Sequence, residues 1–124
     1  GEITAGPDGN LWFTEFLSGK IRHISTSGTV TEFPILIPYT SSFLTGITAG
    51  PDGNLWFTED LYGTNGNSVG GKIGRISPSG TVTEFPVPTA NSEPGEITTG
   101  PDGNLWFTEL YGNKIGRITS GRRA

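Results

Sequence analysis

Five glutamates recur at matching places of a repeated sequence, where together they could bind a ligand. Glu15, Glu59 and Glu109 each close the string GPDGNLWFTE, which occurs three times without change. Glu2 and Glu96 each stand four residues ahead of such a string. Hard cations take clustered oxygen ligands, so these carboxylates predict a cation site or an acidic substrate mouth at one end of the fold.

The same glutamates also have a structural interpretation. A glutamate at a strand end can accept main-chain hydrogen bonds, or can pair with the lysine that follows it, which is Lys20, Lys72 or Lys114. Repetition in every copy favours this structural role, because a catalytic site uses residues that occur once. We therefore keep the five as candidate ligand-binding residues and assign no catalytic residue and no metal ligand.

Histidine, the usual base near neutral pH, occurs once, as His23. An elimination or hydrolysis needs a titratable group at the substrate. We expect His23 to lie inside an outer strand, at the place that Gly74 and Gly116 take in the other repeats. There it would pack as an ordinary strand residue and take no part in catalysis.

Charge and composition narrow the possible partners. The 124 residues carry a formal net charge of −4, which predicts no binding to nucleic acid or to an anionic membrane surface. Cysteine is absent, so disulfides and thiolate metal sites are excluded. No apolar run is long enough for a membrane-spanning helix. We expect no cofactor, and the cellular location stays undetermined.

Three repeated strings divide the chain into short strands. GPDGNLWFTE is followed by KIRHIS, KIGRIS or KIGRIT, and in two repeats also by SGTVTEFP. Apolar, β-branched runs broken by Pro-Asp-Gly-Asn and Ser-Gly turns predict strands joined in hairpins. The predicted strands of the first repeat are Glu2 to Ala5, Leu11 to Glu15, Lys20 to Ser25 and Thr29 to Phe33. The aspartates of the turns, Asp8, Asp52 and Asp102, are predicted to hydrogen-bond the local backbone.

These strands predict an all-β fold built from β-propeller blades. Both faces of each sheet must be covered, because Leu11, Trp12 and Phe13 follow one another and are all large and apolar. A four-stranded antiparallel meander of about 45 residues suits a propeller blade better than a β-solenoid coil. We assign blade 1 to residues 1–45, blade 2 to 46–94 and blade 3 to 95–124, the last without its outer strand. The tryptophans are predicted to fill the space between blades, and the insertion from Asp60 to Gly71 is predicted to be a flexible surface loop.

The strings GPDGNLWFTE, NKIGRI and SGTVTEFPVPT resemble the blade signature of the streptogramin B lyases, also called virginiamycin B lyases. This resemblance implies a seven-bladed propeller and an enzyme that opens the lactone of a cyclic peptide antibiotic by elimination, helped by Mg²⁺. It also implies histidine before an innermost strand, in a Pro-His-Gly context. The corresponding stretches here, residues 43–46 and 93–96, contain no histidine. This departure favours a non-enzymatic propeller, and Mg-assisted lyase activity is the alternative.

Three blades are too few to close a ring, since propellers typically have four to eight. An open stack would expose one apolar blade face at each end. We therefore expect a homo-oligomer, in which two chains form a six-bladed ring with twofold symmetry. A larger ring, or a fragment of a longer propeller, is the alternative. Near-identical repeats fit recent amplification or engineering. The predicted function is thus a self-assembling scaffold with at most generic ligand binding at its acidic mouth.

Overall fold

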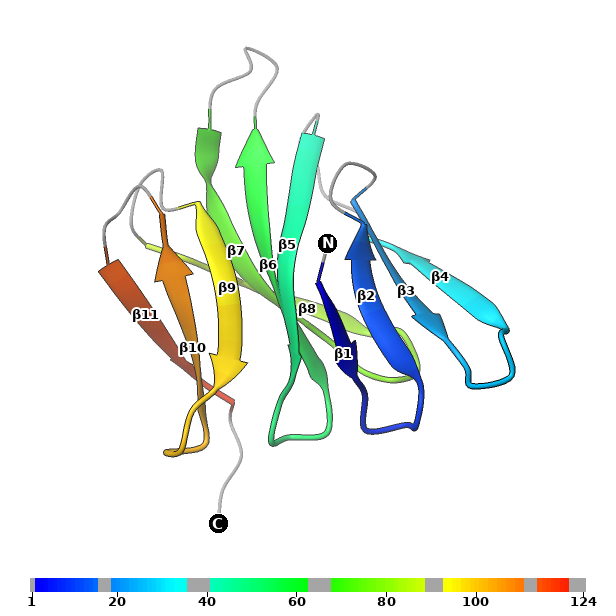
Figure 1. Cartoon of the computed structure of the whole chain (residues 1–124). Helices are drawn as coiled ribbons and strands as arrows, with labels where there is room; N and C mark the ends of the chain where they lie inside the picture. The colour runs from blue at the N-terminus through cyan, green and yellow to red at the C-terminus, as the bar shows by residue number, and fades with distance from the viewer. Residues whose placement is uncertain are drawn as a thin grey trace.

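A computed structural model describes residues 2–15, 19–35, 41–62, 68–88, 93–110 and 114–120. These residues form eleven strands in three antiparallel sheets (Figure 1). They contain no helix, and so no helix long and apolar enough to cross a membrane. The predicted all-β class and the predicted hairpins are confirmed, and the three sheets are three propeller blades.

Each sheet is a meander whose strands follow chain order. Blade 1 contains β1 (Ile3–Ala5), β2 (Leu11–Glu15), β3 (Lys20–Ile24) and β4 (Val30–Pro34). Blade 2 contains β5 (Ser41–Ala49), β6 (Leu55–Tyr62), β7 (Ser68–Ile76) and β8 (Val82–Pro86). Blade 3 contains β9 (Pro94–Thr99), β10 (Asn104–Glu109) and β11 (Lys114–Thr119). Among the described residues, β11 is therefore an edge strand.

Blade 2 is taller than the repeat predicts, because its strands run on into the insertion. Asp60 pairs with Gly71, and Leu61 pairs with Gly70. The prediction of a surface loop from Asp60 to Gly71 is therefore wrong at both ends, although residues 63–67 lie outside the described residues. Burial explains the difference, since Asp60 and Leu61 are covered by neighbouring strands and exchange main-chain hydrogen bonds instead of facing water.

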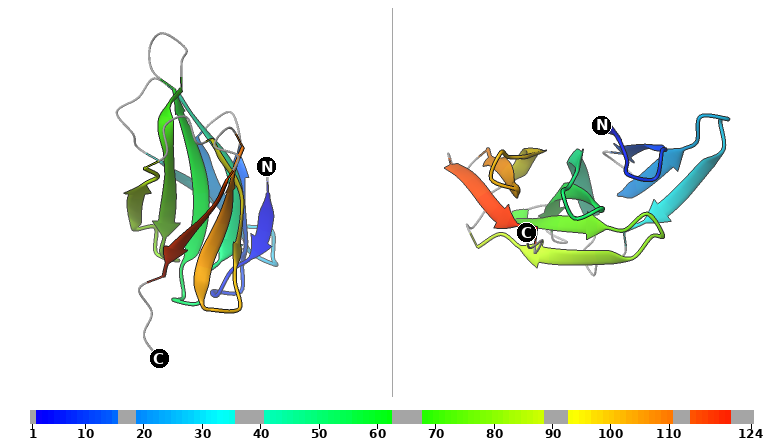
Figure 2. Two further views of the ribbon diagram at one scale, coloured as in Figure 1. Left: turned by 90° about the vertical axis from the view of Figure 1, so that its left-hand side faces the viewer. Right: turned by 90° about the horizontal axis from the view of Figure 1, so that it is seen from below.

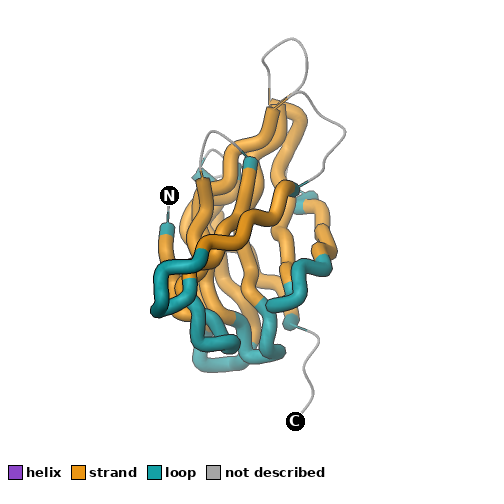
Figure 3. Tube along the Cα trace, turned by 90° about the vertical axis from the view of Figure 1, so that its right-hand side faces the viewer, coloured by secondary structure: helices purple, strands orange, loops and turns teal. Residues whose placement is uncertain are grey.

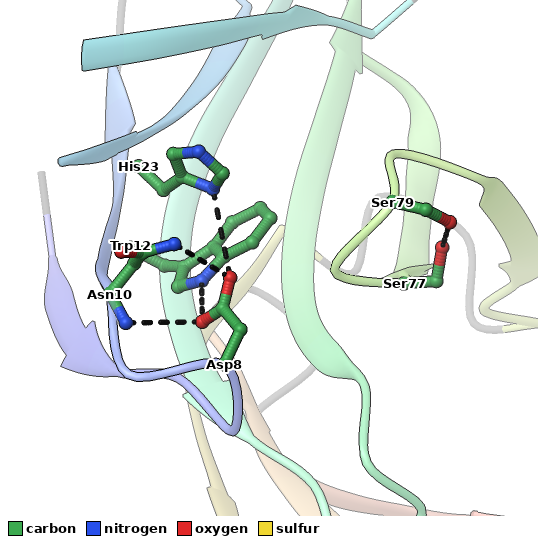
Figure 4. A network of polar contacts seen from close by, with 6 residues as sticks. All are labelled: Asp8, Asn10, Trp12, His23, Ser77 and Ser79. Atoms are coloured by element: carbon green, nitrogen blue, oxygen red, sulfur yellow. Dashed lines mark hydrogen bonds and ion pairs between the residues drawn. The ribbon is translucent and has the colours of Figure 1, made fainter. Parts of the chain in front are cut away.

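Each first hairpin is closed by the same side-chain network at its Pro-Asp-Gly-Asn turn. In blade 1, Asp8 Oδ1 accepts a 2.9 Å hydrogen bond from Trp12 Nε1, and Asp8 Oδ2 accepts one of 2.9 Å from Asn10 Nδ2 (Figure 4). Gly9 has a φ of 82°, a value that favours glycine. The aspartates were predicted as turn residues, and this role is confirmed. They also position the tryptophan ring, which the turn chemistry did not predict.

Each blade has two faces for packing against its neighbours, and each face carries the same types of residue in every blade. We call the side of each sheet that carries Trp12, Trp56 or Trp106 the tryptophan face, and the opposite side, with Phe13, Phe57 or Phe107, the phenylalanine face. The tryptophan face of blade 1 packs on the phenylalanine face of blade 2, and blade 2 packs on blade 3 in the same way. The inner strands β1, β5 and β9 are neighbours across these seams (Figure 2). The described turns gather at one end of the stack (Figure 3).

The stack leaves one face uncovered at each side. Ile3 on the phenylalanine face of blade 1 is 60% exposed, whereas its counterpart Ile47 in the seam is 6% exposed. Ile115 on the tryptophan face of blade 3 is 71% exposed, whereas its counterpart Ile73 is 1% exposed. The tryptophans at positions 12 and 56 are fully buried between blades as predicted, but Trp106 is only half-buried, because it lies on this open face.

Candidate functional site

The inner strands bring two of the predicted glutamates together. Glu2 precedes β1 and Glu96 lies near the start of β9, and the equivalent position of β5, between them, is Gly46. A hydrogen bond to the Glu2 carboxyl, with burial and the charge of Glu2 adding to it, raises the pKa of Glu96. A Cβ atom at position 46 would lie 2.6 Å from the main-chain oxygen of Gly95. The middle blade therefore requires glycine here, and the flanking blades supply the two carboxylates.

A pocket of about 610 Å³ opens beside this pair, and its lining residues lie toward the strand ends that face away from the Pro-Asp-Gly-Asn turns. We call it the acidic mouth, and its acidic lining residues are Glu2, Asp60, Glu93 and Glu96. Aromatic and apolar side chains complete the wall, from Phe43, Tyr62 and Leu110. No lysine, arginine or histidine is among the described lining residues.

Asp60 is the carboxylate of the mouth that titrates near neutral pH. Burial, reinforced by the negative charge of Glu93, raises the pKa of Asp60 to about 7. Its Oδ1 atom is buried and has no hydrogen-bond partner. The strand parity of β6 explains the orientation, since Asp60 shares the tryptophan face with Trp56 and Thr58 and so points toward blade 3.

Glu93 is held in place from both its side chain and its backbone. Tyr62 donates a hydrogen bond of 2.9 Å to Glu93 Oε1. The main-chain oxygen of Glu93 accepts a bond of 3.2 Å from the amide of Leu110. Glu93 also has a φ of 43°, which is uncommon for a residue other than glycine. These contacts from blades 2 and 3 fix its carboxylate at the rim of the mouth beside Asp60.

The other three predicted glutamates lie outside the mouth, at the ends of the second strands and on their phenylalanine faces. Glu15 forms a 3.0 Å ion pair with Arg22. Glu59 is fully buried in the seam with blade 1, and Glu109 is buried in the seam with blade 2. In blade 1, the partner arginine lies two residues beyond Lys20, the lysine predicted to pair with Glu15.

Glu59 shares its buried site with Glu84 and Lys72. Burial, together with a hydrogen bond to Glu84 and the charge of Glu84, raises the pKa of Glu59 to about 9. Lys72 Nζ lies 3.9 Å from Glu84 Oε1 and offsets part of this charge. Without a proton between them, the oxygens of Glu59 have no donor. In blade 1, the guanidinium group of Arg22 provides the positively charged donor that the blade 2 glutamates lack. It lies 2.6 Å from Glu32 and also contacts Glu15.

His23 does not replace a glycine, so that alignment is wrong by one residue. The pairing of β2 with β3 places His23 opposite Trp12, and the equivalent pair in blade 2 is Arg75 opposite Trp56. Arg22 is the residue that takes the place of Gly74. The strings KIRHIS and KIGRIS, aligned position by position, place His23 with Arg75 and Arg22 with Gly74.

His23 is a packed residue, as predicted. Its ring centroid lies 4.7 Å from that of Trp12 and 5.2 Å from that of Phe33, both in edge-on geometry. Its Nδ1 atom is 3.8 Å from Asp8 Oδ2 (Figure 4). Asp8 and Trp12 belong to the turn network of blade 1 and Phe33 belongs to β4, and none of the three lines the acidic mouth.

A metal site is not formed by the described residues. They contain no group of three or more histidine, cysteine, aspartate or glutamate side chains arranged to hold a metal ion. The chemistry that the mouth can offer is a cluster of negative charge next to aromatic rings, which suits an organic cation.

The chain matches the model of the virginiamycin B lyase family over residues 1–123. A crystal structure of virginiamycin B lyase from Staphylococcus aureus is similar, at 48% sequence identity and a TM-score of 0.82 over 98% of this chain and 38% of that one. A catalytically inactive histidine-to-alanine form of that enzyme, with quinupristin, gives 48% identity and a TM-score of 0.80 over the same shares.

A streptogramin B lyase structure is 41% identical, with a TM-score of 0.78 over 98% of this chain and 37% of that one. No curated protein matches. The chain therefore spans less than two fifths of the length of these three lyase structures.

Proposed function

The chain belongs to the virginiamycin B lyase family, and from this premise we propose that it is a non-enzymatic propeller section that binds an organic cation at its acidic mouth. The observation that carries the proposal is the convergence of Glu2, Asp60, Glu93 and Glu96 on one pocket with no cationic lining residue among those described. Burial and the charge of Glu93 raise the pKa of Asp60, and a hydrogen bond to Glu2, with burial and the charge of Glu2, raises the pKa of Glu96; a bound cation relieves this repulsion.

The pocket favours an amine over a bare metal ion. Its volume of about 610 Å³ exceeds what a single ion needs. The rings of Phe43 and Tyr62 lie edge to face with centroids 5.2 Å apart and supply an aromatic wall. Ammonium groups are attracted both to carboxylates and to such rings. A flexible polyamine is the ligand class that uses all of these features.

We propose that the chain is not catalytic because its single histidine lies outside the acidic mouth. The S. aureus relative is catalytically inactive when a histidine is changed to alanine. In this chain, His23 packs against Trp12 and Phe33 outside the mouth. No other histidine is available in the sequence to act as a base.

We also propose that two chains close a ring of six blades. The seams within the chain always join a tryptophan face to a phenylalanine face. The uncovered tryptophan face of blade 3 and the uncovered phenylalanine face of blade 1 are the two halves of such a seam. A second copy can therefore supply both missing halves through a twofold axis.

Binding of spermidine, measured by isothermal titration calorimetry at pH 8, tests the function of the mouth. Replacing Glu2 and Glu96 together by glutamine should weaken binding by about tenfold or more, because two charge-assisted contacts are lost. Glu15→Gln is the matched control, since it removes a carboxylate outside the mouth and should leave the affinity unchanged. Equal affinities for all three proteins would refute the proposal.

One observation favours the second candidate, a lyase that opens a cyclic depsipeptide lactone by elimination. Asp60 has a pKa of about 7 and could accept a proton near neutral pH. Incubation with a streptogramin B and Mg²⁺, followed by mass spectrometry and chromatography, separates the two candidates. We expect unchanged antibiotic. Ring opening that disappears in Asp60→Asn would establish the enzyme instead.

A further inference from the structure

The acidic mouth contains two carboxyl pairs that differ in burial. Glu2 and Glu96 are hydrogen-bonded to each other, and Glu96 is exposed to solvent. We call these two residues the outer pair. Asp60 interacts with Glu93 where blade 2 packs on blade 3, and Asp60 is only 8% exposed. Since a buried carboxylate interacts more strongly with a ligand than an exposed one, the two pairs should differ in what they recognise.

The buried pair is flanked by two aromatic rings. Phe43 lies directly opposite Asp60 in the pairing of β5 with β6, so both side chains are on the tryptophan face of blade 2. Tyr62 lies two residues beyond Asp60 on the same face, with its ring centroid 5.2 Å from that of Phe43. The hydroxyl of Tyr62 donates a hydrogen bond to Glu93. We call these four residues, Phe43, Asp60, Tyr62 and Glu93, the aromatic subsite.

One oxygen of the aromatic subsite has no donor from the protein. Among the described residues that line the mouth, Oδ1 of Asp60 is the only buried side-chain polar atom without a partner. The lining threonines, in contrast, use their hydroxyls within the fold. The hydroxyl of Thr45 lies 2.6 Å from that of Thr58, and the hydroxyl of Thr108 accepts a bond from the amide of Glu96. A buried acceptor without a donor costs free energy, so a ligand that brings an N–H group relieves that cost.

A primary ammonium group matches this arrangement. It carries three N–H donors, enough for both carboxylates of the aromatic subsite, and its charge is attracted to an aromatic ring. A quaternary ammonium group carries the same charge without any donor and leaves Oδ1 of Asp60 without a partner. A site built to hydrogen-bond a ligand group rejects an analogue that lacks this group. The outer pair is open to water, so it needs only the charge of the ligand.

We propose that the aromatic subsite takes a primary ammonium group and that Asp60 sets this selectivity, whereas the outer pair recognises charge alone. This inference rests on the proposed binding of an organic cation at the mouth, and it adds which end group that cation must have. The ligand class is a polyamine with at least one unmethylated terminal amine. A fully methylated polyamine of the same charge is a poor ligand.

Three forms of one ligand test the selectivity without altering the protein. Spermidine, spermidine trimethylated at one terminal nitrogen, and spermidine with every nitrogen quaternary carry nearly the same charge at pH 8. Calorimetry should give similar affinities for the first two, since each has a free terminal amine, and an affinity about tenfold weaker for the third. Absence of spermidine binding would refute the proposed function together with this inference. Equal affinities for all three forms would refute this inference alone.

Two variants separate the hydrogen-bond acceptor from the charge. Asp60→Leu keeps a similar side-chain shape without an acceptor, and should reduce the preference for spermidine over the fully quaternary form from about tenfold to about onefold. Replacing Glu2 and Glu96 together by glutamine should weaken both ligands by a similar factor and keep the preference. Circular dichroism checks that the variants fold, and the comparison of ligands in the parent protein depends on neither of them.

The same two variants can overturn the proposal. A preference that persists in Asp60→Leu would show that the larger ligand is excluded by its size and not by the missing donor. Loss of the preference in the double glutamine variant would show that the outer pair, and not Asp60, reads the end group of the ligand.

Discussion

The hydroxyl of Thr58 donates a 2.8 Å hydrogen bond to the main-chain oxygen of Gly95 and so joins blade 2 to blade 3. The same hydroxyl accepts a bond of 2.9 Å from the amide of Gly46 within its own blade. In the other seam, Thr14 donates to the main-chain oxygen of Thr45 at 3.2 Å. In both seams, a buried threonine of the second strand therefore links neighbouring blades where their inner strands meet.

Thr58→Val should destabilise the stack by about 1–3 kcal/mol, because it leaves the buried amide of Gly46 without its side-chain acceptor. Urea unfolding followed by tryptophan fluorescence measures the change. Thr108→Val is the matched control, since Thr108 holds the same position in blade 3 but lies exposed on the open face. A loss of stability as large in the control as in Thr58→Val would contradict the role of the seam.

Gly46→Ala should also destabilise the fold, by about 1–3 kcal/mol, because the new methyl group would meet the backbone of blade 3 and force the strands apart. Thermal unfolding gives the measure. Gly95→Ala serves as the comparison, since a Cβ at that position meets only the hydroxyl of Thr108, at 3.1 Å. We expect the second variant to melt at a higher temperature than the first.

Glu59→Gln should stabilise the protein at pH 8 and have little effect at pH 4. The pKa of Glu59 is raised by folding, so the folded state keeps a proton that the unfolded state loses. Between the unfolded pKa near 4.5 and the folded value of about 9, stability therefore falls as pH rises. The slope for one proton is about 1.4 kcal/mol per pH unit.

Denaturant unfolding at several pH values tests this linkage. Glutamine keeps a donor toward Glu84 at every pH and should flatten the profile in the range from 4.5 to 9. Glu15→Gln removes the equivalent carboxylate of blade 1, which is paired with Arg22 near the surface, and should leave the slope of the parent protein intact. A parent profile that is already flat would show that Glu59 is ionised in the fold.

Spermidine binding should strengthen as pH rises through 7. Asp60 has its pKa raised to about 7, so it is neutral below this value and charged above it. Only the charged form attracts an amine. Calorimetry at pH 6 and pH 8 should show tighter binding at the higher pH, and Asp60→Asn should remove most of the difference. An unchanged pH dependence in that variant would assign the effect to another group.

Ring closure predicts a dimer in solution. Sedimentation equilibrium should give twice the chain mass, and Leu11→Glu, on the open phenylalanine face of blade 1, should shift the protein toward the monomer. The reason is that Leu11 is the counterpart of Leu55, which is fully buried in a seam. A monomeric parent protein at all concentrations would refute self-assembly.

The sequence predicts the blades well because each one is specified locally. The turn chemistry, the apolar and β-branched runs and the repeated strings all lie within about 45 residues of one another, and the observed strands follow them. The pairing of Glu2 with Glu96 was also predictable, since both stand four residues ahead of the string GPDGNLWFTE in different repeats.

Asp60 and Glu93 were missed as members of the mouth for the opposite reason. Both lie in segments that differ between repeats, and they meet only when blade 2 packs on blade 3. Their proximity depends on strand parity and on the left-handed backbone of Glu93, which no repeated string encodes. Only the position of Asp60 could have been predicted to contribute to the mouth. Asp60 directly follows Glu59, the last residue of LWFTE, so in a strand it lies on the opposite face from Glu59.

The bond from Trp12 to Asp8 spans four residues, and its copies in the other blades do the same. Contacts between residues this close in the sequence form early in folding, because closing such a small loop costs little chain entropy. Each hairpin can therefore close before any seam exists. The seams, in contrast, are nearly interchangeable, since any tryptophan face accepts any phenylalanine face. The difficult step in refolding is thus the order of the blades, and trapped species with blades joined in the wrong order or between chains are the expected product of refolding at high concentration.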